Sequence, residues 1–343
     1  MNTPMLSKGQ RIVLIVAFVI VAPLAVLALW PGLFGQSMAK FPGSLLIESP
    51  VSWTAPSGES ISGLMLYTPE EGSVSSPFAP NLGVLFAPGP GTFSADGEEA
   101  LGTEMTPSST TLVAVSRRAQ AVDHTIDVAP AGTAFAGLLW ASGSDKVAYI
   151  KIPSLHNLPL APDGKPYFVT NGATSTLRAG ISLPDAFQPS VYATSLDGSA
   201  PVSLGQGRPI MFSPDGSQIL MLDSKGLEVV DLANGSRSSL SGISGTDFAA
   251  YFVADSADSV ILAGKADASS TLYHIDWQSG TASPAGNVSE TFTNAFFMNG
   301  ELVTMEPQSS TAHSYVVKNG ALAKGPAYTL ALPPQGTVIG WIP

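Results

Sequence analysis

The chain has 343 residues, of which 45% are hydrophobic and only 12% are charged, and its formal net charge is −11. Binding to phosphates requires clustered Lys and Arg, and the 15 such residues here are scattered, so nucleic acid is excluded as a partner. The absence of cysteine excludes disulfides, thiolate metal sites and a cysteine nucleophile.

The N-terminal segment predicts a membrane anchor. Residues 12–30 are nearly all apolar, and as a helix at about 1.5 Å per residue they span about 28 Å, close to the hydrocarbon thickness of a bilayer. Lys8 and Arg11 precede this run, which places the N-terminus in the cytoplasm and the rest of the chain outside. We therefore predict a cytoplasmic N-terminus over residues 1–11, a transmembrane signal anchor over 12–33 and a juxtamembrane connector over 34–49.

A cleaved signal peptide is the alternative interpretation of this segment. Ser37, Met38 and Ala39 have the small-x-small pattern of a cleavage site, so the protein would be secreted after cleavage near Ala39. The apolar run is longer than a usual signal peptide, which favours the anchor. Both interpretations export the remainder of the chain.

Residues 50–343 read as an all-β domain. Short runs of β-branched and aromatic residues are bounded by turn residues, and no stretch after residue 40 holds apolar residues at helical spacing for three turns. The predicted strands in the first part of the domain are Val51–Thr54, Ile61–Tyr67, Leu82–Phe86, Thr111–Val115, Gly137–Trp140, Lys146–Ile152 and Ser190–Ser195.

A loose repeat in the second half predicts a β-propeller. Strand-turn-strand phrases open at residues 210, 251 and 296, about 40 to 45 residues apart, which is the length of a propeller blade. Turn glycines at positions 198, 235, 280 and 320 follow the same rhythm. The length predicts about seven four-stranded blades, with six or eight as alternatives, and Thr337–Ile342 could close the ring by pairing with N-terminal strands.

The clearest copy of the repeat carries a resemblance. Phe212–Leu220, with the turn Pro214-Asp215-Gly216 inside it, resembles the core phrase of the TolB-like, WD40-like bacterial propeller repeats. The match covers one blade well and two or three others weakly. It implies a fold whose members serve mainly as binding platforms, and it implies no chemistry.

The sequence contains no recognisable catalytic set. His124, His156, His274 and His313 lie in four different parts of the chain, and neither HExxH nor G-x-S-x-G occurs. No catalytic residue, metal ligand or cofactor is therefore predicted. The densest charged stretch, Arg117, Arg118, Asp123, His124 and Asp127, is the candidate for a partner surface or a channel mouth, against the alternative of a solvated loop and strand face.

Two further groups have alternative interpretations. Asp96, Glu98 and Glu99 could hold calcium through carboxylate oxygens or could be an ordinary acidic loop. Trp53, Trp140, Trp277 and Trp341 could stack on a sugar, but strand tryptophans usually fill the core.

The sequence thus predicts a membrane-anchored, extracytoplasmic β-propeller of a bacterial envelope. It would act as a non-catalytic protein-interaction module or as an accessory subunit of an envelope complex, with the membrane and another envelope or membrane protein as its partners. The alternative is a hydrolase or lyase acting on glycans or peptides in the central channel. A small-ligand sensor is a third hypothesis, but about ten cytoplasmic residues leave no output domain.

Overall fold

The computed structural model describes residues 39–343 except 87–88, 90, 142–143, 156–157, 172–173, 244–259, 264–269, 289–291, 293, 306–309, 319–320 and 334. The predicted N-terminus (1–11), the transmembrane helix (12–33) and the first part of the connector (34–38) lie outside the described residues, as does the repeat opening at residue 251. The rest of the predicted connector (34–49) is described, and a strand already begins within it at Ser44. No helix within the described part of the chain is long and apolar enough to cross a bilayer.

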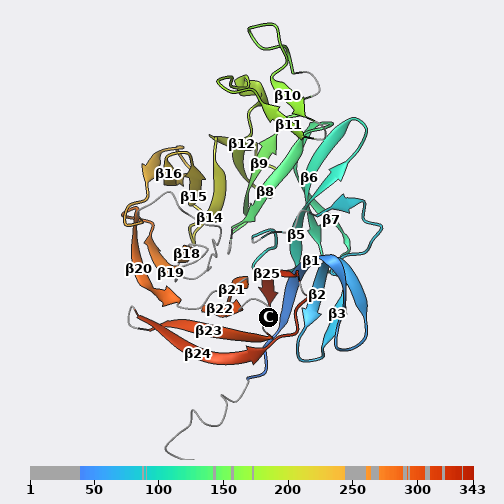
Figure 1. The fold of residues 1–343 in the computed structure, drawn as a ribbon, viewed down its shortest axis with the longest axis vertical. Coiled ribbons are helices and arrows are strands. Elements are labelled where there is room, and N and C mark those ends of the chain that lie inside the picture. The colour runs from blue at the N-terminus through green and yellow to red at the C-terminus, as the bar shows by residue number, and fades with distance from the viewer. Residues whose placement is uncertain are drawn as a thin grey trace, which may run out of the picture.

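Five four-stranded antiparallel sheets form the blades of a ring (Figure 1). Blade 1 contains β25 (Thr337–Ile342), β1 (Ser44–Thr54), β2 (Ser60–Thr68) and β3 (Ser73–Ser75). Blade 2 contains β4 (Val84–Leu85), β5 (Glu99–Met105), β6 (Ser109–Ser116) and β7 (Ala121–Pro130). Blade 3 contains β8 (Ala134–Trp140), β9 (Lys146–Ile152), β12 (Ser190–Ser195) and β13 (Val202–Gly205).

The second half of the chain completes the ring. Blade 4 contains β14 (Arg208–Phe212), β15 (Gln218–Asp223), β16 (Gly226–Asp231) and β17 (Arg237–Ser239). A three-stranded sheet follows, with β18 (Val260–Ala263), β19 (Ser270–Asp276) and β20 (Thr281–Val288). Blade 5 contains β21 (Asn294–Met298), β22 (Glu301–Met305), β23 (Thr311–Lys318) and β24 (Ala321–Thr329). In every sheet the strand named first lies nearest the centre of the ring and the strand named last at its outer edge.

The all-β propeller prediction is confirmed, whereas the prediction of about seven blades is wrong, since the described residues form five four-stranded blades. Two stretches of sequence add no such blade. The described residues between β13 and β21 supply blade 4 and a three-stranded sheet. The described residues between β9 and β12 lie outside the ring of blades. The number of blades is therefore smaller than the chain length divided by the length of one blade.

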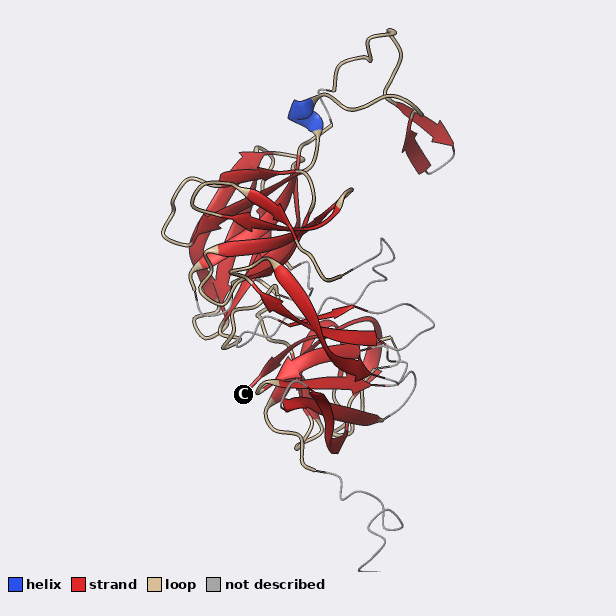
Figure 2. Ribbon diagram, turned by 90° about the vertical axis from the view of Figure 1, so that its left-hand side faces the viewer, coloured by secondary structure: helices blue, strands red, loops and turns tan. Residues whose placement is uncertain are grey.

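The chain between β9 and β12, residues 153–189, forms an insertion. It carries the hairpin of β10 (Phe168–Asn171) and β11 (Thr174–Leu177) and the 3-10 helix η2 (Asp185–Phe187). The hairpin stands away from the ring in two views at right angles (Figures 1 and 2). The Arg178 side chain forms an ion pair with Asp163, with Nη1 at 3.1 Å from Oδ1. This ion pair links the segment before β10 to the segment after β11 within the insertion.

The ring is closed by the two ends of the described chain. Strand β25 pairs with β1 in antiparallel register, with Leu45 opposite Trp341, as the sequence predicts. The indole Nε1 of Trp341 also donates to the carbonyl of Pro42 at 2.8 Å. The chain enters the propeller beside β24, where the Ala39 amide donates to the carbonyl of Ala327 at 3.0 Å.

The repeat phrases fall where the propeller interpretation requires. The openings at 210 and 296 lie on β14 and β21, the innermost strands of blades 4 and 5. Gly235 (φ 71°) turns between β16 and β17, and Gly198 (φ 81°) turns between β12 and β13, in a conformation that L-residues with side chains adopt at a cost. Gly320 lies outside the described residues.

The hydrophobic core is divided into layers between adjacent sheets. Leu101, Leu112 and Ile126 of blade 2, for example, pack against Trp140 and Tyr149 of blade 3. Trp140 is a buried core residue, and Trp53, Trp277 and Trp341 pack against core clusters while partly exposed. Because every blade depends on its neighbours for burial, polar side chains placed between blades contribute to the stability of the whole ring.

Candidate functional site

The charged stretch singled out in the sequence lies at the outer edge of blade 2. Arg117 and Arg118 are in the turn between β6 and β7, and Asp123, His124 and Asp127 are on β7, the outermost strand. This edge is far from the innermost strand β4 in the strand order, so the stretch faces the rim and not the central channel. The channel-enzyme alternative thereby loses the residues on which it depended.

A β-bulge brings Asp123 and His124 together. Val115 pairs with Val122 and Ala114 pairs with His124, so Asp123 is an extra residue without a partner on β6. In a regular strand two consecutive side chains point to opposite faces, and a bulge breaks this alternation. As a result Asp123 Oδ2 lies 3.6 Å from His124 Nε2, although the two residues are neighbours in sequence.

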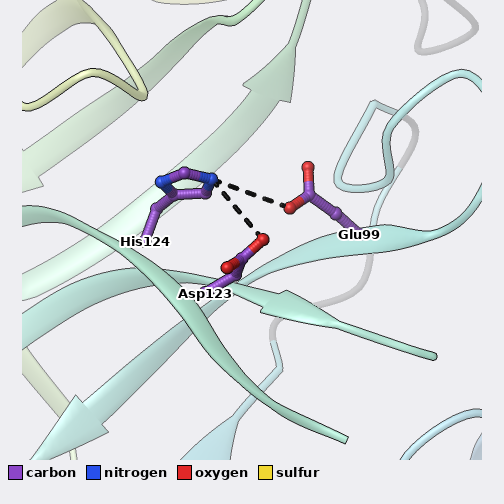
Figure 3. A group of neighbouring side chains, drawn as sticks. All are labelled: Glu99, Asp123 and His124. Carbon is purple, nitrogen blue, oxygen red and sulfur yellow. Dashed lines mark ion pairs between the residues drawn. The ribbon is translucent and has the colours of Figure 1, made fainter. Parts of the chain in front are cut away.

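Glu99 joins this pair from two strands away. It is the first residue of β5, and its Oε1 lies 4.0 Å from His124 Nε2 (Figure 3). One donor atom each from Glu99, Asp123 and His124 lies within 4.8 Å of the others. Burial raises the pKa of the Glu99 carboxyl, and its contact with the Asp123 carboxyl raises it further. We call these three residues the edge cluster.

Sequence reasoning missed the edge cluster because Glu99 is 24 residues from Asp123 along the chain. Only the register of three strands brings the two carboxyls together: Glu99 pairs with Ser116 of β6, which in turn pairs with Ala121 of β7. The adjacent Asp123 and His124 were the single signal available, and they do not reveal a third donor.

The neighbouring charges are paired separately. Arg117 Nη2 lies 2.8 Å from Glu98 Oε1. The Asp96 carboxylate accepts from the Ser94 hydroxyl at 2.7 Å and from the Glu98 amide at 3.1 Å, and the Ser94 contact is the main reason its pKa is lowered. Asp96, Glu98 and Glu99 thus have three different sets of partners, which does not support the calcium interpretation.

Asp127 has a different role from Asp123. Its carboxylate accepts from the Tyr149 hydroxyl at 2.8 Å and from Lys151 Nζ at 2.9 Å, both on β9 of blade 3. Lys151 Nζ also lies 5.6 Å from the ring centre of Tyr192, within range of a cation–π contact. Burial raises the pKa of the Tyr149 hydroxyl. Asp127, Tyr149 and Lys151 form what we call the inter-blade lock.

The other histidines do not approach one another within the described chain. His274 is on β19 and His313 is on β23, in different sheets from His124, and His156 lies outside the described residues.

A shallow cavity of about 350 Å³ lies between the turn of the Phe212–Leu220 phrase and the β19–β20 turn. Asp215, Ser217 and Trp277 are among the residues that line it. The Asp215 carboxylate is engaged by Ser213 Oγ at 2.7 Å and by the Ser217 amide at 3.0 Å, and the Ser213 hydroxyl contributes most to lowering its pKa to about 2. Because the carboxylate oxygens of Asp215 accept hydrogen bonds from residues of the turn itself, we interpret Asp215 as a structural residue.

The sheets described above define a β-propeller, the fold that the repeat phrase predicts. No protein-family model and no curated protein matches the chain.

Several solved structures are similar to the chain. One is TolB from Acinetobacter baumannii, with 10% identity, a TM-score of 0.46 and coverage of 91% of this chain and 70% of that chain. Another is the acylaminoacyl peptidase of Pyrococcus horikoshii, with 11% identity, a TM-score of 0.46 and coverage of 84% and 46% respectively. The Cps50 (Swd1) β-propeller domain of Myceliophteria thermophila has 10% identity, a TM-score of 0.38 and coverage of 74% and 91%. Values this low say nothing about what the chain binds.

Proposed function

We propose that this protein is a membrane-tethered, extracytoplasmic propeller that binds another protein of the bacterial cell envelope and has no catalytic role. The insertion at residues 153–189 carries this proposal. Leu160 is 62% exposed and Val169 is 50% exposed, and they lie on a segment that stands away from the ring (Figure 2). Exposed apolar side chains on a projecting loop of a rigid scaffold are typical of a binding element.

The hairpin in the insertion supports the same conclusion. Strands β10 and β11 form a sheet of only two strands, and such a sheet is marginally stable in water by itself. Each strand also has one edge with no neighbour in the sheet order. A partner that adds a strand or covers the apolar side chains would satisfy both needs.

The position of the insertion fits a tethered protein. The blue start of the described chain lies on the lower side of the ring, and the β10–β11 hairpin stands above its upper side (Figure 1). An anchor at residues 12–33 would therefore hold the hairpin on the side of the propeller away from the bilayer. The tether would also raise the local concentration of the propeller near membrane partners.

Site-specific photo-crosslinking in native membranes tests the proposed function. A photoreactive residue in place of Leu160 or Leu177 of the full-length protein should give one discrete adduct with an envelope protein, identified by mass spectrometry. The same residue in place of Met105, which is also exposed but lies on blade 2, is the matched control and should give none. No adduct from the insertion, or equal adducts from all three positions, would refute a binding role for the insertion.

The anchor is tested separately. If residues 12–33 remain as a helix, the mature protein resists alkaline extraction from membranes and keeps its original N-terminus. If a signal peptidase cuts near Ala39, N-terminal sequencing finds a start close to Lys40 and the protein is released.

A further inference from the structure

The edge cluster has the donor set and the dimensions of a metal site. His124 offers an imidazole nitrogen, and Glu99 and Asp123 offer carboxylate oxygens. In a tetrahedral zinc site with bonds of about 2.0 to 2.1 Å, neighbouring donor atoms lie about 3.3 Å apart. The two distances from His124 Nε2, 3.6 Å and 4.0 Å, exceed this value by less than about 1 Å.

The His124 imidazole makes no hydrogen bond to either carboxyl of the edge cluster. A nitrogen–oxygen distance of 3.6 Å or 4.0 Å is longer than a hydrogen bond, which for N–H···O is about 2.7 to 3.2 Å. The ion pairs nearby are short by comparison, at 2.8 Å for Arg117 with Glu98 and 2.9 Å for Lys151 with Asp127. The imidazole of His124 therefore stands at a distance from both carboxyls, while the Glu99 and Asp123 carboxyls contact each other.

Nearby cationic side chains do not neutralise the two carboxylates. Arg117 is paired with Glu98, and Lys151 is paired with Asp127. Among the ion pairs of the described residues, His124 is the one partner of Glu99 and of Asp123. Two facing carboxyl groups with a single imidazole between them gain more from a divalent cation than from any cation the neighbouring strands supply.

We propose that Glu99, Asp123 and His124 bind a zinc ion at the outer edge of blade 2. One nitrogen and two oxygen donors suit zinc, whereas calcium requires six to eight oxygen ligands. Three protein ligands leave the fourth position to water or to a group from another molecule. His124 and Asp123 are 39% and 55% exposed, so the ion reaches the site directly from solvent.

The strand geometry holds the ligands in place. All three are on strands, and the bulge at Asp123 is what places two consecutive side chains on the same ion. A site built on paired strands is more rigid than one built on a loop. Ala114 lies directly opposite His124 on β6. Its small side chain leaves room for the His124 imidazole to extend across β6 toward Glu99.

Zinc titration of the full-length protein in detergent tests the site. The protein carries a tag without histidines, is stripped with a chelator and is then titrated with zinc chloride in competition with a chelating indicator. We expect one zinc ion per chain, and a loss of affinity of at least about tenfold in Glu99→Gln and in His124→Ala, each of which removes one of three ligands.

Matched variants separate the site from general effects of charge. Glu104→Gln removes a carboxylate from the other end of β5, and His274→Ala removes an imidazole from β19, and both should bind zinc as the wild type does. Circular dichroism confirms that each variant is folded, and Asp123→Asn provides a nearly isosteric third test. A wild type that binds no zinc, or edge-cluster variants that bind it as tightly as the wild type, would overturn the proposal.

Discussion

Asp123 and Asp127 lie on the same strand, but their carboxylates have opposite environments. The side chain of Asp123 is 55% exposed and lies 3.6 Å from His124 Nε2. The side chain of Asp127 is 10% exposed and is bound by Tyr149 and Lys151 of the next blade. One strand at the edge of a sheet thus supplies a surface cluster at one end and an inter-blade contact at the other.

Two bulges explain the difference. The first leaves Asp123 without a partner on β6, and the second leaves Ile126 without one, between the pairs Val113–Thr125 and Leu112–Asp127. The second bulge lets Ile126 enter the core while the next residue, Asp127, reaches blade 3. Residue type alone therefore does not separate a ligand-type carboxylate from a structural one, and local pairing does.

Asp127→Ala should have the largest effect on stability. The Tyr149 hydroxyl and the Lys151 ammonium would lose their shared acceptor, and we expect the free energy of unfolding to fall by about 2–3 kcal/mol. Urea denaturation followed by tryptophan fluorescence measures this change, since Trp140 packs in the same core layer.

Asp123→Ala is the matched control for Asp127→Ala on the same strand. It removes an exposed carboxylate and should change the free energy of unfolding by no more than about 0.5 kcal/mol. Equal destabilisation by the two substitutions would mean that the contrast in their environments has no energetic counterpart.

Tyr149→Phe should destabilise the protein less than Asp127→Ala, lowering the free energy of unfolding by about 1 kcal/mol. The substitution removes one hydrogen bond but keeps the buried ring and the Lys151–Asp127 ion pair. The same urea measurement on the Asp127→Ala, Tyr149→Phe double variant completes a double-mutant cycle. We expect its loss to be smaller than the sum of the two single losses, because both substitutions break the same hydrogen bond. Full additivity would contradict the inter-blade lock.

The fold was largely predictable from local patterns. The openings at residues 210 and 296, the turns at Gly198 and Gly235, and the closing strand at Thr337–Ile342 each depend on a few consecutive residues, and the structure confirms all of them. The blade count was not predictable, because the insertion has the same mixture of strand and turn residues as the blades.

The candidate site was predictable only in part. Its position at Arg117–Asp127 was visible in the sequence as a dense run of charged residues. The sequence did not show that Asp123 and His124 belong to the edge cluster while Asp127 belongs to the inter-blade lock. Glu99 enters through the register of β5, β6 and β7, and Tyr149 and Lys151 reach Asp127 from another blade. These are contacts between strands and between sheets, for which a single sequence provides no signal.

Asp215 combines features of the other two aspartates: its carboxylate is exposed, like that of Asp123, and hydrogen-bonded, like that of Asp127. Contacts led by the Ser213 hydroxyl lower its pKa to about 2 in the folded protein, below the value of about 3.9 expected for an unfolded Asp. A carboxyl with a lowered folded pKa stabilises the fold above the unfolded pKa, and this contribution is lost as the pH falls toward the folded pKa.

Asp215→Asn should therefore have a smaller effect than Tyr149→Phe, and one that depends on pH. Near neutral pH the variant should be less stable than the wild type, by less than about 1 kcal/mol because solvent screens an exposed group. The difference should shrink between about pH 4 and pH 2, as the wild-type carboxyl takes up its proton. Thermal unfolding at several pH values measures it, with Glu104→Gln as the control for loss of one charge. A difference that stays constant down to pH 2 would mean that the carboxylate charge does not stabilise the Ser213–Ser217 turn, and that exposure alone distinguishes Asp215 and Asp123 from Asp127.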